Sequence, residues 1–341
     1  MDRRQANDLG PNPQKNRGPG AGGGHALPDL GWTWTAAGAS SRSLRAVVPP
    51  GARLDARAVA FFWGTSDEDP GAGCFEGVAR TRAPLLTGAV AAPIGVALAD
   101  AVAACAVGRA AVALSGGLDS AAVLACAAAL GVRDAFVLAP VGMGGYDERD
   151  AALEAAAALG ARATVVEARE EDFVAALPEC VAACGAPLYN LHPVGKYLLA
   201  RAAAAAGVTV LISGDGADEA ARGEGGERWL PIAAALAEAG GARLACPFTR
   251  ADVRAALAGD TDKRALRAWL ADRFAPAARR PKRPRYAPAM DLSRWIDPGE
   301  LAALGAELGR PPPLGARAAF DHDKDAVRWA TLALLARHVR A

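Results

Sequence analysis

Between residues 94 and 212 the chain alternates short apolar runs with longer stretches of helical spacing. Four runs contain apolar residues without alternation, as strands buried on both faces do, at 110–114, 135–139, 163–167 and 208–212. The stretches between and before them place apolar residues on one helical face, at 94–106, 120–130, 148–159, 170–184 and 195–206. This alternation predicts an α/β fold in which a parallel sheet has helices on both faces.

The flanking sequence follows other patterns. Residues 1–30 are rich in Gly, Pro, Asn and charge, which predicts a disordered tail. Residues 31–93 predict a small degenerate β-rich N-terminal region, because Pro and Gly separate short apolar pieces at 32–34, 44–48 and 59–63. No strand pattern follows residue 225, and helical spacing predicts a C-terminal helical lobe over 231–341, with helices at 251–257, 262–274 and 323–337. The main domain is therefore expected at 94–230.

Composition narrows the function classes. The chain has 341 residues, 52% of them hydrophobic, and a net charge of +1, so no global basic surface argues for nucleic acid. No apolar stretch reaches the roughly 18 residues of a membrane-spanning helix, and the first residues contain no apolar signal segment. We therefore expect a cytoplasmic protein with no membrane partner.

Cysteine and lysine usage adds two observations. Cys180 and Cys184 lie one helical turn apart, but none of the four histidines clusters with them, so we interpret both as buried thiols and not as metal ligands. Arginine carries most of the positive charge. A position that keeps lysine is therefore a candidate for a function that needs an ammonium group, and the five lysines are Lys15, Lys196, Lys263, Lys282 and Lys324.

The first chemical signal follows the run at 110–114. Residues 114–120 read Leu-Ser-Gly-Gly-Leu-Asp-Ser and lie where a strand should pass into a helix. Two glycines let backbone N–H groups approach a ligand, and the helix start favours a phosphate or pyrophosphate. Asp119 offers a carboxylate to magnesium, and no Gly-Lys-Ser/Thr follows, so this is not a Walker A loop. The alternative interpretation is a glycine-rich turn that binds no ligand. The complete motif at a strand-to-helix junction favours ATP binding over this alternative.

The second signal follows the run at 208–212. Residues 213–219 read Ser-Gly-Asp-Gly-Ala-Asp-Glu. Three carboxylates so close together repel one another unless a cation is present, so Asp218 and Asp215 are candidate neighbours of Mg²⁺ bound to a polyphosphate. Taken alone, the motif fits equally well a solvated acidic turn that caps the next helix.

Together the two motifs resemble the synthetase domain of asparagine synthetases, within the PP-loop, or N-type, ATP pyrophosphatases (adenine nucleotide α-hydrolase-like). The resemblance extends from about residue 94 to the C-terminus. It includes 146–148, Tyr-Asp-Glu; 246–248, Cys-Pro-Phe; and 280–282, Arg-Pro-Lys. β-Lactam synthetases and lasso-peptide cyclases share this domain. The resemblance implies ATP and Mg²⁺ as cofactors.

Carried over position by position, the resemblance also implies roles for single residues. The pyrophosphate end of ATP would be held by Ser115, Gly116, Gly117, Asp119 and Ser120. Ser213 and Asp215 belong to the second ATP-binding loop, and the adenosine pocket would be lined by Leu114, Val137 and Gly214. Asp119 and Asp218 would hold Mg²⁺, and Lys282 would neutralise charge on the α-phosphate, with all three counted as catalytic. A solvated basic loop is the alternative for Lys282, since Arg279, Arg280, Arg283 and Arg285 surround it.

The chain departs from the family at several positions. Glutamine-using members expose an N-terminal cysteine, whereas Asp2 follows Met1 here, so we expect no glutamine hydrolysis and no N-terminal glutaminase domain. Nitrogen would come from ammonia, a separate glutaminase subunit or an amine of the substrate. After Glu219 the family's bulky apolar residues and Gly-Gly-Tyr are replaced by residues 220–224, Ala-Ala-Arg-Gly-Glu, and residues 284–286, Pro-Arg-Tyr, replace Gly-Phe. Both changes lie where the carboxylate should bind, which weakens the prediction that the substrate is aspartate, as in asparagine biosynthesis.

The leading hypothesis is therefore an AMP-forming amide synthetase, a C–N ligase that adenylates a small-molecule carboxylate and joins it to ammonia or an amine. Two alternatives stay open. One is a PP-loop enzyme that adenylates a tRNA base, for which the arginines of 279–285 would form a phosphate-binding patch. The other is a nucleotide-binding subunit without turnover. Near-neutral charge argues against the first, and the intact Asp119, Asp218 and Lys282 argue against the second.

Overall fold

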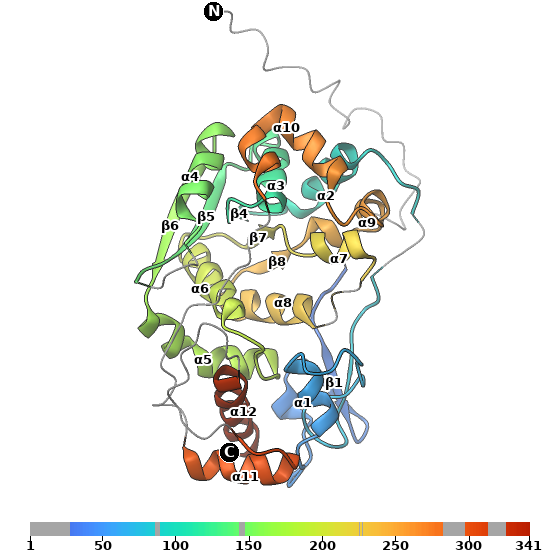
Figure 1. Cartoon of the computed structure of the whole chain (residues 1–341), viewed down its shortest axis with the longest axis vertical. Helices are drawn as coiled ribbons and strands as arrows, with labels where there is room; N and C mark the ends of the chain where they lie inside the picture. The colour runs from blue at the N-terminus through green and yellow to red at the C-terminus, as the bar shows by residue number, and fades with distance from the viewer. Residues whose placement is uncertain are drawn as a thin grey trace, which may run out of the picture.

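A five-stranded parallel sheet forms the centre of the molecule (Figure 1). The structure is a computed structural model that describes residues 28–85, 89–142, 147–224, 226, 228–281, 297–312 and 325–341. The strands lie in the order β6-β5-β4-β7-β8. Their bounds are β4 (Ala110–Ala113), β5 (Asp134–Pro140), β6 (Arg162–Ala168), β7 (Val210–Ser213) and β8 (Arg243–Ala245).

Helices cover both faces of this sheet, which confirms the expected α/β fold (Figure 1). Those packed with the sheet in one core are α2 (Ile94–Cys105), α3 (Leu118–Ala129), α4 (Arg149–Ala158), α9 (Ala251–Leu257) and α10 (Arg264–Arg279). The opposite core contains α6 (His192–Ala205) and α8 (Trp229–Ala239), and α5 (Glu170–Cys184) packs on both of these helices. A short helix, α7 (Ala217–Arg222), follows β7.

The central strands β4 and β7 consist almost wholly of apolar residues, because both are covered on two faces. In β4, Val112 faces the core that contains α3, whereas Ala111 and Ala113 face the core that contains α6 and α8. In β7, Ile212 faces the core that contains α3, and Leu211 faces the core that contains α6 and α8. This two-sided burial is the reason that periodicity showed uninterrupted runs at these strands.

The order of the strands places a topological switch point between β4 and β7. These strands are neighbours, with Val112 opposite Ile212 and Ala113 opposite Ser213. The chain leaves β4 toward β5 on one side, and it later reaches β8 from β7 on the other side. Open parallel sheets bind ligands in the crevice at the carboxyl ends of such strands. Both sequence motifs lie at this crevice.

Two predictions about strands need correction. Residues 243–245 form β8, an edge strand that pairs in parallel with β7, although no strand was expected beyond residue 225. Its three residues, Arg-Leu-Ala, are too few to show a period. In the N-terminal region, β1 (Thr33–Ala36) and β2 (Ala39–Ser41) pair in a three-stranded antiparallel sheet with β3 (Ala79–Thr81), but the apolar pieces at 44–48 and 59–63 are not strands.

Local structure explains why the apolar pieces at 44–48 and 59–63 are not strands. The piece at 59–63 belongs to α1 (Ala56–Phe62), whose N-cap Asp55 accepts hydrogen bonds from the backbone N–H groups of Arg57 and Ala58. This cap satisfies two N–H groups that would otherwise lack partners at the helix start. The piece at 44–48 begins with the 3₁₀ turn η2 (Leu44–Ala46).

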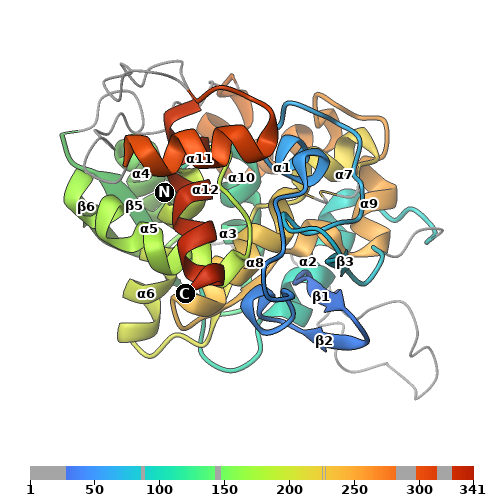
Figure 2. The same ribbon diagram turned by 90° about the horizontal axis from the view of Figure 1, so that it is seen from below.

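One hydrophobic core joins the N-terminal region to the end of the chain (Figure 2). Trp63 packs against Trp329 of α12 (Asp325–Arg340), with ring centroids 5.0 Å apart. Helix α11 (Pro298–Leu308) binds the same region, because Glu307 accepts a 2.5 Å hydrogen bond from the backbone of Leu54. No helix in the described part of the chain is long and apolar enough to cross a membrane.

Candidate active site

The turn from β4 into α3 forms a tight loop held by its own serines. The Ser120 hydroxyl accepts a 3.2 Å hydrogen bond from the Ser115 backbone N–H and lies 3.1 Å from the Ser115 hydroxyl. It also donates to the Gly117 carbonyl. Gly117 is the N-cap of α3 in an extended conformation and places no side chain over the helix start. The N-terminus of a twelve-residue helix therefore opens into the crevice, where its partial positive charge favours an anion.

Gly116 and Gly214 allow this loop to lie close to its neighbours. Gly116 has a φ of +70°, and a Cβ on it would come within 2.6 Å of the Ala152 backbone N at the start of α4. A Cβ on Gly214 would lie 2.8 Å from the backbone N of Ser120. The loops that follow β4 and β7 are thus packed backbone to backbone, and a side chain at either glycine would separate them.

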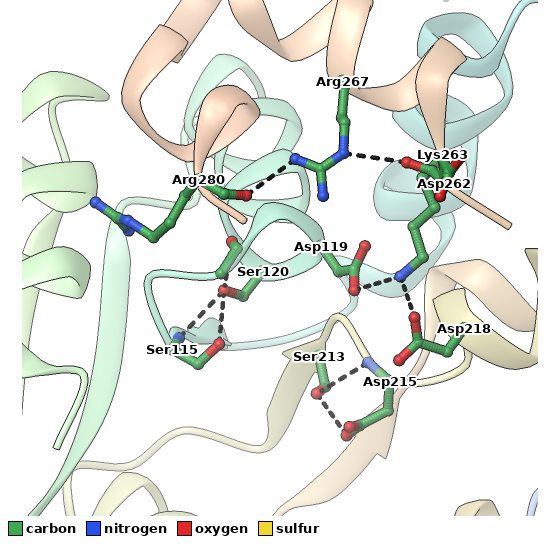
Figure 3. Close-up of polar contacts among 11 residues, drawn as sticks. Ser115, Asp119, Ser120, Ser213, Asp215, Asp218, Asp262, Lys263, Arg267 and Arg280 are labelled. Carbon is green, nitrogen blue, oxygen red and sulfur yellow. Dashed lines mark hydrogen bonds and ion pairs between the residues drawn. The ribbon is translucent and has the colours of Figure 1, made fainter. Parts of the chain in front are cut away.

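The strongest electrostatic feature of the crevice is Lys263 (Figure 3). Its ammonium group lies 2.7 Å from Oδ2 of Asp119 and 2.6 Å from Oδ1 of Asp218. One carboxylate comes from each motif loop, and Lys263 itself precedes α10. The Lys263 side chain is only 7% exposed, so solvent screens these two ion pairs weakly.

A second ion pair involves Asp215, in the loop that follows β7. The Lys196 ammonium, from α6, lies 2.6 Å from Oδ2 of Asp215 and donates a 3.0 Å hydrogen bond to the Ser213 hydroxyl. The Ser213 hydroxyl in turn donates to Asp215, at 2.7 Å. The indole N–H of Trp229 donates a longer bond of 3.4 Å to Oδ1 of the same carboxylate. Asp215 is therefore fixed in orientation by three side chains.

Two arginines, Arg267 and Arg280, position the end of α10 beside the loop of residues 115–120 (Figure 3). Arg280 donates a 2.6 Å hydrogen bond to the Gly116 carbonyl and pairs with Glu154 of α4. Arg267 donates to the backbone carbonyls of Ala278 and Arg280, which holds the chain after the kink at Phe274 close to the start of α10. Guanidinium groups thereby fix the position of residues 278–280 relative to the loop.

Burial changes the ionisation of two further groups near the crevice. Burial raises the pKa of the Glu219 carboxyl, and the neighbouring Asp215 and Asp218 charges raise it further. The pKa of the Cys246 thiol is also raised, chiefly by complete burial and next by the Asp215 charge. Glu219 therefore holds a proton more readily than an exposed glutamate, and Cys246 is a poor nucleophile.

These residues surround a cavity of about 800 Å³. Its wall includes nearly all of the described residues that the sequence predicted for a nucleotide site: Leu114, Ser115, Gly117, Asp119, Ser120, Val137, Ser213, Gly214, Asp215 and Asp218. Gly116 lies behind this wall, against α4. Lys282 and Tyr146 lie outside the described residues. The cavity is large enough for a nucleotide together with a second small molecule.

Sequence reasoning gave no site role to five cations of the cavity wall, Lys196, Lys263, Arg264, Arg267 and Arg280. Arg280 was named only in the Arg-Pro-Lys segment and as part of a basic loop. The scarcity of lysine was a usable signal for Lys196 and Lys263, although it was applied only to Lys282. No motif marks Lys263, whose partner Asp119 lies 144 positions away in the sequence.

The donor groups suit a magnesium nucleotide. The oxygens of Asp119 and Asp218 converge on one point, and Mg²⁺ in nucleotide sites takes one or two carboxylates, with phosphate oxygens and water as its other ligands. Within the described ranges no group of three or more His, Cys, Asp or Glu side chains forms a metal site without a ligand. Two carboxylates alone offer fewer protein ligands than the four of a typical structural metal centre.

Comparisons with known proteins give one family match around this crevice. Residues 94–239 match the family model described as asparagine synthase. Among solved structures, NMN synthetase from Francisella tularensis matches 73% of this chain and 93% of its own at 18% identity, with a TM-score of 0.34. No curated protein matches the sequence.

Proposed function

We propose that this chain, whose residues 94–239 match the asparagine synthase family model, is an ATP-dependent, AMP-forming amide synthetase. The family match supports ATP-dependent adenylation or amidation. The finer proposal is a C–N ligase whose substrates are a small-molecule carboxylate and either ammonia or an amine.

One observation carries the proposal: the loops after β4 and β7 meet at the switch point, and Asp119 and Asp218 converge there on one cation. The Lys263 ammonium is that cation in this structure, and Mg²⁺ bound to a polyphosphate could neutralise the same two carboxylates. Like charges this close are costly unless a cation is shared. The arrangement is what a metal-bound polyphosphate requires.

The proposed roles follow from position in the cavity. The loop of 115–120 and the start of α3 bind the pyrophosphate part of ATP, while Leu114, Val137 and Gly214 contact the adenosine. Asp119 and Asp218 hold Mg²⁺, which would supply charge neutralisation on the phosphates. Lys282, outside the described residues, stays a proposed catalytic cation at the α-phosphate.

The reaction has two bond exchanges. A carboxylate oxygen of the substrate attacks the α-phosphorus, and the bond to the β-phosphate bridging oxygen breaks, which releases pyrophosphate and leaves an acyl-adenylate. The amine nitrogen then attacks the acyl carbon, loses a proton and displaces AMP. Asp215 is the described carboxylate that Lys196 and Trp229 hold in place, and we assign it to the amine step.

The direct test is a pyrophosphate-release screen across carboxylates, with ammonium chloride or glutamine as the nitrogen source. We expect release with ammonium chloride, and no glutamine-dependent release by this chain alone. Asp119→Ala and Lys282→Ala should reduce release by about 10²-fold or more, because each removes charge stabilisation at the phosphates. Glu171→Ala, an exposed position on α5, is the matched surface control. Turnover at the wild-type rate in Asp119→Ala would contradict the assignment.

The same screen separates the other hypotheses. ATP binding without pyrophosphate release from any carboxylate, with ammonia present, would favour a nucleotide-binding subunit. Retention on tRNA that weakens steeply with salt would favour a tRNA-modifying enzyme.

A further inference from the structure

The ammonium group of Lys263 lies between the two carboxylates that are proposed to hold the metal. It is within 2.7 Å of Asp119 Oδ2 and 2.6 Å of Asp218 Oδ1, the two oxygens best placed to coordinate Mg²⁺ (Figure 3). Both contacts are within the range of strong charge-assisted hydrogen bonds. The two carboxylates therefore have a shared counter-ion within the protein itself.

Electrostatics makes this arrangement exclusive. A magnesium ion between the same two oxygens would meet the Lys263 charge at short range in a site where the lysine side chain is 7% exposed. Repulsion between cations is strong in such a weakly screened place. The carboxylates can bind the ammonium or the metal, but both together need an additional anion.

The backbone fixes the base of the lysine but leaves its end able to move. Lys263 has a φ of +54°, unusual for a residue other than glycine, and its N–H donates a 2.8 Å hydrogen bond to the Asp260 carbonyl. The Asp260 side chain is fixed in turn by the backbone N–H of Ala265. The four-carbon stem nevertheless allows the ammonium to turn from a carboxylate to a phosphate.

We propose that Lys263 is an internal counter-ion that occupies the metal position until nucleotide binds, so that Mg²⁺ enters only together with the polyphosphate. The phosphate oxygens accept the displaced ammonium, and the metal takes over the carboxylates. This inference rests on the proposed function in so far as it assumes a magnesium nucleotide as ligand. It assigns a purpose to a strained residue that the family resemblance did not identify.

Binding of metal and nucleotide is then coupled through one side chain. Nucleotide removes the competitor of the metal, and the metal frees an ammonium for the nucleotide. Linkage requires that each ligand tightens the other by the same factor. Without Lys263 the coupling should weaken, because the metal no longer has a competitor to displace.

The test measures binding of Mn²⁺, as a magnesium substitute, to the full chain without nucleotide, by the electron paramagnetic resonance signal of free Mn²⁺. We expect Lys263→Met to bind Mn²⁺ at least tenfold more tightly than the wild type. The non-reactive analogue α,β-methylene ATP should increase the Mn²⁺ affinity of both proteins. We expect the factor of increase to be at least ten times larger for the wild type than for Lys263→Met. Equal Mn²⁺ affinity of the two proteins without nucleotide would overturn the proposal.

Lys196→Met is the matched control, because it removes an ammonium from the same cavity but from a different carboxylate, at a side chain that is 18% exposed. Its Mn²⁺ affinity should change less than threefold. An increase equal to that of Lys263→Met would mean that general cavity charge, and not occupation of the site, sets the affinity, and it would overturn the proposal. Adding Asp218→Asn to Lys263→Met should abolish the gained binding.

A second measurement covers the case in which Lys263→Met folds poorly. For the wild type alone, the melting temperature should rise little with Mn²⁺ and strongly with Mn²⁺ plus α,β-methylene ATP. A large rise with Mn²⁺ alone would contradict the inference. None of these experiments needs a carboxylate substrate or turnover, so the counter-ion proposal can fail while pyrophosphate release is observed, and the reverse also holds.

Discussion

Both lysines in the described part of the chain meet carboxylates of the cavity, which shows what residue usage can reveal. Where arginine supplies nearly all positive charge, Lys196 and Lys263 remain as ammonium groups beside Asp215, Asp119 and Asp218. An ammonium is a compact charge that can serve two carboxylates in turn, whereas a guanidinium requires a planar partner. The scarcity of lysine was therefore a sound indicator, but it cannot say which carboxylate each lysine meets, because those pairs depend on the fold.

Lys196→Met should impair the amine step. The change removes the ammonium that holds Asp215, and a misplaced catalytic group can cost about 10²-fold in rate. We expect kcat for amide formation to fall more than KM for ATP changes, and Lys196→Arg to restore part of the rate. Steady-state kinetics with the carboxylate found in the screen measures both. Arg201→Met, an exposed position on the same helix, should keep the wild-type rate; an equal loss there would exclude a specific effect of Lys196.

At the scale of elements, periodicity located β4, β5, β6, β7 and the helices between them, often within two residues. The reason is clearest at β4, β5 and β7, because buried strands and long amphipathic helices carry strong patterns. It failed at β8, whose three residues pair at the edge of the sheet, and at α1, where the cap by Asp55 decides the structure. The motifs located both loops of the site. The contacts of Lys263 with Asp119 and of Arg280 with Gly116 depend on how α10 packs, and no local sequence pattern predicts that packing.

Gly214→Ala should separate the two loops. The new Cβ would lie 2.8 Å from the Ser120 backbone N and 3.0 Å from the Asp119 carbonyl carbon, and backbone atoms cannot move aside as a side chain can. We expect a loss of about 1–3 kcal/mol in the free energy of unfolding and at least tenfold weaker ATP binding. Chemical denaturation and calorimetry measure the two effects. In Gly299→Ala the close neighbour is only a side-chain oxygen, so unchanged ATP affinity is expected there.

The buried pair of Arg250 and Asp252 should matter for the packing of α9 on α2. Arg250 is 2% exposed, binds both Asp252 oxygens and donates a 3.0 Å hydrogen bond to the Ala97 carbonyl. Arg250→Met leaves buried acceptors without this donor and should cost about 3–5 kcal/mol in urea unfolding. Arg264→Met, which removes an 82% exposed partner of Asp260, should cost less than about 1 kcal/mol.

The ion pair of Arg250 and Asp252 should make the free energy of unfolding depend on pH. Burial alone would raise the pKa of Asp252, but the hydrogen bond and charge of Arg250 lower it below the ordinary 3.8. A carboxyl with a lowered pKa in the native state stabilises the fold above its unfolded pKa, and this contribution is lost as the pH falls through the native value. The difference in unfolding free energy between wild type and Arg250→Met should thus be largest near neutral pH and shrink below about pH 4. An unchanged difference at pH 3 would show that the ion pair contributes nothing.

At the scale of the whole molecule, the hydrophobic cores enclose every cysteine. All six thiols are free and buried. Burial raises the pKa of Cys105, Cys126 and Cys184 to about 12. Because the thiolate is the reactive form, we expect no reaction with a disulfide reagent at pH 8 in the native protein, and six equivalents in denaturant. One thiol that reacts quickly in the native protein would contradict this burial.

The contact between Trp63 and Trp329 joins the first and last parts of the described chain in a single core. During synthesis on a ribosome, the N-terminal tryptophans leave the exit tunnel long before α12 exists to cover them. A nascent chain that ends before residue 325 therefore presents apolar rings to the surrounding solution, and contacts between such distant residues form slowly. This core should thus close only after α12 has left the ribosome.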